Sequence, residues 1–144
     1  MPNVRVLKPP ALGMSFILNV DGQVGPDGAN DPGDVRLVQR LTNMAAKIGT
    51  KGSRIGLPSV TGQFDAATGF WIYNLQAHMK NSHPNQIVDG IVSPARGSTY
   101  TANTSWTIAL LNYYANQGSS GEYSALQDEA MAWPTFDSNG TRVT

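Results

Sequence analysis

The sequence predicts a mainly α-helical fold, a small orthogonal bundle of three to four helices with a short N-terminal extended arm or β-hairpin. Apolar residues recur at spacings of three and four in four separate segments, which is the period of an amphipathic helix. Two short glycine-containing turns, at residues 60–65 and 88–94, each precede one of these segments. A chain of 144 residues is long enough for one domain with a core of useful size.

The first 29 residues are typical of an extended arm. Val4 and Val6 alternate with polar neighbours, which is the period of a strand. Residues 14–20 are rich in strand formers, and Asp21-Gly22 follows as a dipeptide typical of hairpin turns. We therefore expect a strand pair near this turn, either packed on its own domain or added to the sheet of a neighbouring chain.

Two aspartates mark the starts of helices. Asp31 stands directly before Pro32, and these two residue types suit the N-cap and first position of a helix over residues 32–47. Asp65 likewise suits the N-cap of a helix over residues 66–81. Phe70 and Tyr73 widen the apolar surface of this second helix beyond a single stripe, so we expect it to be buried on more than one side.

Two further helices are expected in the C-terminal half. The third, over residues 105–116, has a candidate N-cap in Asn103 or Thr104. The fourth, over residues 122–133, is followed by Pro134, which cannot continue a helix. We divide the chain into an N-terminal arm, a helical domain, and a C-terminal helix with a polar tail, at residues 1–29, 30–116 and 117–144.

The composition disfavours several classes of partner. Ten basic and ten acidic residues give a formal charge of zero, and no basic stripe is present to neutralise nucleic-acid phosphates. The apolar run at residues 11–20 is about half the length that a bilayer requires, and no signal-peptide cleavage pattern follows it. We therefore expect neither nucleic acid nor a membrane as partner, and any export would not use a recognisable signal peptide.

A family pattern covers residues 30 to 115, in a first helix, two turns and the two helices that follow them. The matching positions are Asp34, Val35, Val38 and Gln39; Gly62, Gln63, Phe64, Asp65, Thr68, Ile72, Leu75 and Gln76; Asp89, Gly90, Ile91 and Val92; and Thr104 and Trp106. In these positions the chain resembles the peptidoglycan-binding-like domains, three-helix modules often attached to cell-wall hydrolases. The resemblance implies a groove between helices that holds bacterial cell-wall material.

The chain departs from that pattern in several places. Trp71 replaces a small residue, Ser93 replaces a turn glycine, and residues 95–103 are inserted before the third helix. A side chain as bulky as Trp71 would rebuild the groove between the helices.

Catalytic chemistry is not indicated. His78 and His83 are five residues apart, which matches neither the four-residue spacing of helical metal ligands nor a zinc signature, even with Asp65 or Asp89 added. The chain contains no cysteine and no Gly-x-Ser-x-Gly nucleophile elbow. We therefore expect a protein that is not an enzyme and that has no metal site and no cofactor.

Aromatic and amide side chains are the remaining candidates for binding. Aromatic rings bury large areas and can carry polar tips, so they serve well as anchors. Trp71 also falls on an apolar helical stripe, where a core position explains it. Gln39 and Gln76 occupy matched positions on two helices, and we expect them to bridge backbone groups of the fold. The candidate ligand-binding residues are Trp71, Asn74, Tyr100 and Tyr114.

Two functions follow as expectations. The first is a non-catalytic module that binds peptidoglycan. The second is a structural or adaptor subunit of a virion, secretion apparatus or filament, which contacts other protein subunits or forms a homo-oligomer through its terminal arms. The low charged content of 14% and the arms favour the second function. An extracellular, cell-wall-associated or virion location suits both.

Overall fold

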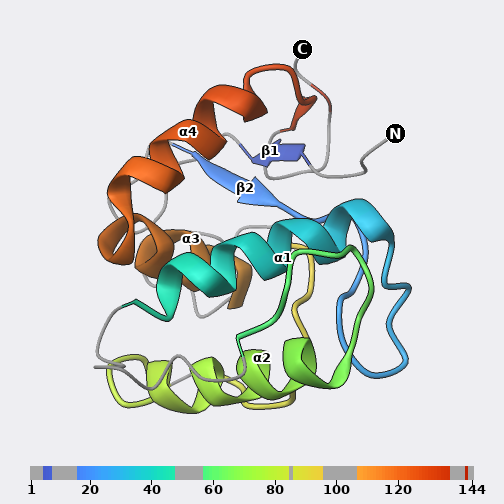
Figure 1. Cartoon of the computed structure of the whole chain (residues 1–144), viewed down its shortest axis with the longest axis vertical. Coiled ribbons are helices and arrows are strands. Elements are labelled where there is room, and N and C mark those ends of the chain that lie inside the picture. Colours follow the sequence, from blue (N-terminus) through green and yellow to red (C-terminus); the bar gives the residue numbers. More distant parts are fainter. Residues whose placement is uncertain are drawn as a thin grey trace.

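The computed structural model describes residues 5–7, 16–47, 57–84, 86–95, 107–136 and 142. These residues form four helices and three short strands (Figure 1). The mainly helical bundle with N-terminal strands that the sequence predicts is confirmed. In chain order, the elements are β1 (Arg5–Leu7), β2 (Ile17–Asn19), α1 (Pro32–Ala45), α2 (Ala66–Met79), α3 (Thr107–Gly118), α4 (Ser120–Ala130) and β3 (Thr135–Phe136).

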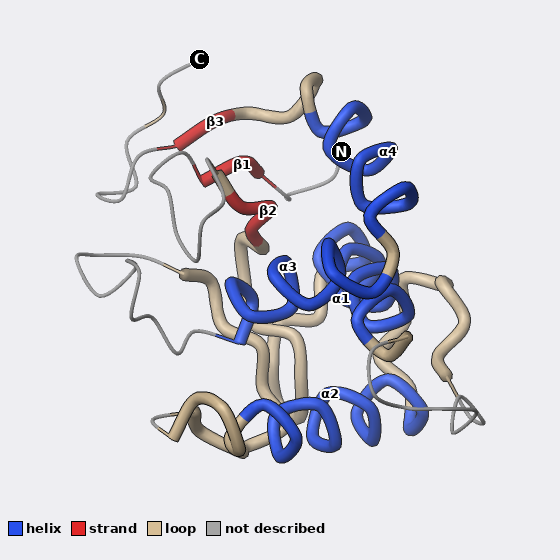
Figure 2. The backbone as a smooth tube through the Cα atoms, turned by 90° about the vertical axis from the view of Figure 1, so that its left-hand side faces the viewer, coloured by secondary structure: helices blue, strands red, loops and turns tan. Residues whose placement is uncertain are grey.

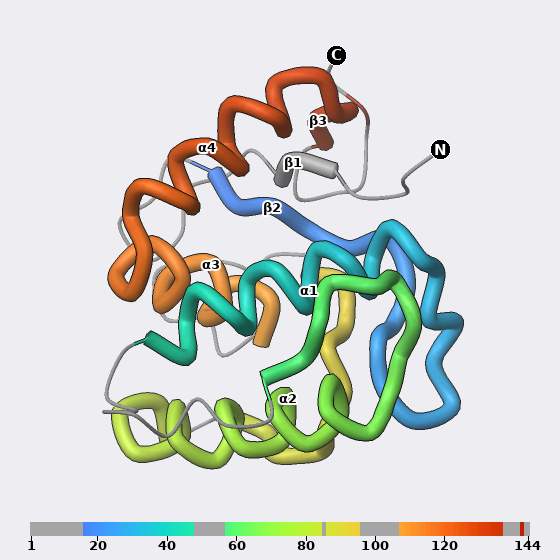
Figure 3. Tube along the Cα trace, in the orientation of Figure 1, coloured from blue at the N-terminus to red at the C-terminus, as the bar shows by residue number. Residues whose placement is uncertain are grey.

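The elements lie in three layers (Figure 2). The helix α2 forms one end of the molecule, α1 and α3 form the middle, and α4 lies with the strands at the opposite end. In sequence order, the middle of the chain therefore makes one end of the molecule, and its two outer parts meet at the other (Figure 3).

The two aspartates expected as N-caps occupy those positions. The Asp31 carboxylate accepts a hydrogen bond of 3.0 Å from the backbone N–H of Gly33, and Pro32 is the first residue of α1. The Asp65 carboxylate accepts one of 2.8 Å from the backbone N–H of Thr68. Each cap satisfies an N–H group that has no partner within its helix.

The strands form a sheet in the order β2-β1-β3. Strand β1 runs antiparallel to β2, with Val6 opposite Leu18, and parallel to β3, with Val6 opposite Thr135. The arm does contain an antiparallel strand pair, but β2 pairs with β1, which precedes it, and the hairpin expected at the Asp21-Gly22 turn is wrong. The backbone N–H groups of that dipeptide instead donate to the carboxylate of Asp34, both at 3.0 Å, and so attach the end of β2 to α1.

Side-chain amides cover the outer edge of β2. Asn112 of α3 accepts from the Leu18 N–H and donates to the Leu18 carbonyl, both at 2.9 Å. Asn19 makes the same pair of bonds, both at 3.0 Å, with the backbone of Ala95. An exposed strand edge invites pairing with another chain. The Asn112 amide occupies the Leu18 groups that would make it, and Asn19 attaches β2 to the segment at Ala95.

One hydrophobic core draws on all three parts of the chain. Val35, Val38 and Leu41 of α1 are fully buried at its centre. Leu18 from the arm and Leu126 from α4 belong to the same core and are also fully buried. The helical domain at residues 30–116 therefore shares its interior with the segments on either side of it.

Helix α2 is buried on one side only. Trp71 and Ile72 face the core at 3% and 1% exposure, whereas Phe70 and Tyr73 are 63% and 56% exposed. The expectation that this helix is buried on more than one side is therefore wrong. The physical reason is its place in the fold, because an end layer has neighbours on a single face.

Candidate functional site

Two buried glutamines hold the turns that flank α2. The side-chain oxygen of Gln39, on α1, accepts from the backbone N–H groups of Thr61 and Gly62 at 2.9 and 3.0 Å. Its amide nitrogen donates to the Gln63 carbonyl and the Thr68 hydroxyl, both at 3.0 Å. One side chain thus fixes the turn that leads into α2.

Gln76, on α2, repeats the arrangement at the following turn. Its side-chain oxygen accepts from the backbone N–H groups of Asp89 and Gly90 at 3.2 and 2.8 Å. Its amide nitrogen donates to the Ile91 carbonyl and the Thr107 hydroxyl, both at 3.0 Å. The prediction that these glutamines bridge backbone groups is confirmed.

Each glutamine-held turn requires a glycine. Gly62 and Gly90 have φ angles of 82° and 75°, in the left-handed region that side chains with a Cβ rarely adopt. The turns before and after α2 therefore share one arrangement: a glycine in the left-handed conformation, whose backbone N–H donates to a buried side-chain amide. Together they fix both ends of α2 relative to α1 and α3.

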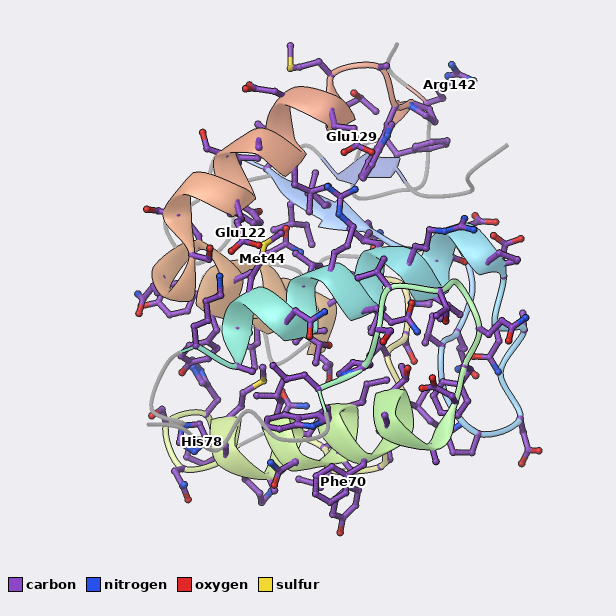
Figure 4. All side chains as sticks on the ribbon, viewed as in Figure 1. Met44, Phe70, His78, Glu122, Glu129 and Arg142 are labelled. Atoms are coloured by element: carbon purple, nitrogen blue, oxygen red, sulfur yellow. The ribbon has the colours of Figure 1, made fainter. Side chains whose placement is uncertain are left out.

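The fixed helix presents an open outer face. Phe70, Tyr73 and Asn74 are exposed there, at helical spacings of three and four that place them side by side. Ala66 and Ala77 are exposed on the same helix and extend this face. We call these five residues the α2 outer face. In Figure 4, Phe70 points away from the rest of the molecule.

The outer face carries no formal charge. Residues 66–79 contain no Asp, Glu, Lys or Arg. The nearest carboxylate in the chain, Asp65, receives two hydrogen bonds from Thr68, one from its hydroxyl and one from its N–H, and these lower the pKa of Asp65. The nearest lysine, Lys80, donates to the carbonyl oxygens of Pro84 and Gln86 at 3.2 and 3.0 Å.

The four candidate ligand-binding residues do not form one site. Asn74 lies on the outer face, but Trp71 lies behind it in the core, and 3% exposure leaves its ring closed to a ligand. Tyr114 is half-buried on α3, with its hydroxyl 3.1 Å from the His83 ring nitrogen. Tyr100 lies outside the described residues.

The sequence predicts that Phe70 and Tyr73 widen a buried surface, whereas the structure leaves both rings exposed. The Phe70 ring stands edge-on to Trp71, with 6.1 Å between centroids and 84° between planes, so a buried ring braces an exposed one. The sequence signal for this exposed face was that residues 66–79 contain no Asp, Glu, Lys or Arg. A helix without charged residues and with a wide apolar surface is typically buried on several sides. Nothing in the local sequence shows which side of such a helix lacks a neighbour.

The described residues were compared with the requirements of a metal site and of a membrane-spanning helix. Among them, no three His, Asp or Glu side chains come together in a way that could hold a metal ion. No helix in the described ranges is both long enough and apolar enough to cross a bilayer.

Comparisons of the chain with models of protein families, with curated proteins and with solved structures found no significant match.

Proposed function

We propose that the protein is a non-catalytic binding module for bacterial cell-wall material and that it binds through the α2 outer face. The observation that carries the proposal is the pair of exposed rings, Phe70 and Tyr73, on a helix without formal charge. Neighbouring exposed apolar side chains on a soluble protein often mark a binding surface. The resemblance to peptidoglycan-binding-like domains covers this helix and both turns that hold it.

Co-sedimentation with purified sacculi, beside light scattering of the free protein, tests the proposal. We expect saturable binding by a monomer, weakened in the double variant Phe70→Ala/Tyr73→Ala. Met131→Ala is the matched control, because Met131 is 81% exposed beside α4, at the opposite end of the molecule from α2. Protein that stays in the supernatant at every sacculus concentration contradicts the proposal.

A structural or adaptor subunit is the second candidate function, and one observation favours it. The α2 outer face offers a protein neighbour exposed rings on a helix whose two ends are fixed by Gln39 and Gln76. The described parts of the arms pair within the chain, through β1 with β2 and β3, so assembly would proceed through α2. A large assembly in light scattering, with sacculi left unbound, would support this function.

A further inference from the structure

We infer that the α2 outer face binds the sugar rings of a neutral glycan, such as the N-acetylated sugar backbone of the wall, and does not bind the peptides attached to that backbone. This inference rests on the proposed function and names the chemistry of the ligand. It follows from the charge, the area and the hydrogen-bonding groups of the face.

The charge of the face suits a neutral ligand. A wall peptide carries carboxylates, and a protein that binds carboxylates offers Arg or Lys for charge-assisted hydrogen bonds. The outer face has neither residue, and the adjacent Lys80 is held by two backbone carbonyls. A sugar ring instead presents C–H groups on its flat side, and these pack against the electron-rich face of an aromatic ring.

The two exposed rings present a small area compared with a protein interface. At 63% and 56% exposure, Phe70 and Tyr73 together present roughly 240 Å² if each ring residue offers about 200 Å². A standard protein interface buries about 800 Å² on each partner. Two neighbouring rings provide a platform of the size that a short run of sugar units covers.

Polar groups beside the rings are available to a ligand. In the described part of the chain, neither the Asn74 amide nor the Tyr73 hydroxyl has a hydrogen-bond partner. An amide supplies both donors and an acceptor, and a phenol supplies one of each, so they match sugar hydroxyls and N-acetyl groups. The ring platform and these groups lie on one helix face.

The platform is rigid before any ligand arrives. Gln39 and Gln76 fix the turns at the two ends of α2, and Trp71 braces Phe70 from behind. A surface that does not need to be ordered on binding loses less entropy when it binds. A small face that is already ordered therefore needs fewer contacts to bind a ligand.

The test is an NMR titration of the full chain with chitotetraose, a neutral tetramer of β-1,4-linked N-acetylglucosamine, and separately with a soluble wall tetrapeptide. We expect chitotetraose to shift the amide signals of Phe70, Tyr73 and Asn74, and the tetrapeptide to leave them in place. Phe70→Ala and Tyr73→Ala should each weaken chitotetraose binding by about tenfold, the equivalent of about 1.4 kcal/mol. Met131→Ala should bind like the wild type.

Four outcomes would overturn the inference. Sacculus binding with shifts on α2 only from the tetrapeptide, or with chitotetraose shifts away from α2, would leave the proposed function intact and reject the sugar assignment. A concentration-dependent dimer that Phe70→Ala abolishes would assign the face to a second copy of the chain. Failure to bind sacculi, chitotetraose and tetrapeptide alike would reject the proposed function together with the inference.

Discussion

At the scale of single residues, the two buried glutamines satisfy turn groups that neither helix nor sheet reaches. Gln76 is fully buried and binds two backbone N–H groups, a carbonyl and a hydroxyl. Removing one partner of a buried hydrogen bond leaves the other without a partner at a cost of about 1–3 kcal/mol. The fixed position of α2 therefore depends on individual side chains as well as on apolar burial.

We expect Gln76→Ala to lower the free energy of unfolding by about 2–4 kcal/mol, because it leaves several polar groups of the turn unpaired. Urea unfolding measures this as a lower midpoint at an unchanged slope. Gln117→Ala is the control, since Gln117 is exposed on α3 and should change stability by less than about 0.5 kcal/mol. A loss for Gln76→Ala as small as that of the control would contradict a stabilising role for the amide.

Two carboxylates should respond to pH in opposite directions. Burial raises the pKa of Asp34, whereas hydrogen bonds from the hydroxyl and N–H of Thr68 lower the pKa of Asp65. A raised pKa in the folded state favours the protonated form, so the contribution of Asp34 to stability is fully present below its unfolded value and falls as pH rises through its folded pKa. The contribution of Asp65 is present above its unfolded value and is lost as pH falls through its folded pKa.

Unfolding free energies between pH 3 and pH 7 test this contrast against Asp34→Asn and Asp65→Asn. The stability advantage of the wild type over Asp65→Asn should shrink towards low pH. Relative to Asp34→Asn, the wild type should lose stability as pH rises. Profiles of both variants that run parallel to the profile of the wild type would show that neither carboxylate has the shift described.

At the scale of elements, apolar burial should hold α4 in place far more than its ion pairs do. The pair Arg40–Glu129 joins α1 to α4, and Lys47–Glu122 joins the turn after α1 to α4, but the two glutamates are each 54% exposed. Exposed ion pairs contribute about 0–1 kcal/mol. Leu126, in contrast, is fully buried in the core.

We expect Leu126→Ala to cost about 2–5 kcal/mol, since it removes buried methyl groups and leaves a cavity. Glu129→Gln should cost less than about 1 kcal/mol, because the surrounding water already screens its pair with Arg40. Thermal and urea unfolding of the two variants give the comparison. If Glu129→Gln proves as damaging as Leu126→Ala, the ion pairs and not the core would hold α4.

The helices and their caps could be predicted because the signals for them are local. Asp31 and Asp65 stand within three residues of the N–H groups that they cap, so the sequence window contains both partners. Asp34 accepts hydrogen bonds from the N–H groups of Asp21 and Gly22, which are 13 and 12 residues away. The residues next to that dipeptide show only its preference for a hairpin turn. The local sequence pattern does not show that a distant side chain will bind these N–H groups.

The candidate site was predicted less well, because it depends on the order of the layers. Periodicity identified α2 and its apolar residues, but whether Phe70 or Trp71 faces water depends on where α1 lies. Asn74 was identified and does lie on the exposed face. Tyr73, like Phe70, was expected to widen the buried surface, because periodicity alone does not specify which side of a helix is covered.

At the scale of the whole molecule, the two ends of the chain complete one interior. Strand β1 lies between β2 and β3, so it joins the N-terminal arm to the segment after α4. Leu18 of the arm and Tyr123 of α4 are both connected to Asn112, through bonds of 2.9 Å from the Leu18 N–H and 2.5 Å from the Tyr123 hydroxyl. The middle of the chain therefore lacks part of its core when it is isolated.

We expect a fragment of residues 30–116 to lack a cooperative unfolding transition. Its α3 would expose the apolar surface that β2 and α4 cover in the full chain, and a shortened core cannot offset the entropy of ordering the backbone. Circular dichroism and tryptophan fluorescence should give one coincident transition for the full chain and a gradual, non-coincident change for the fragment. A sharp, coincident transition for the fragment would instead establish residues 30–116 as an independent folding unit, with the arm and α4 as additions to it.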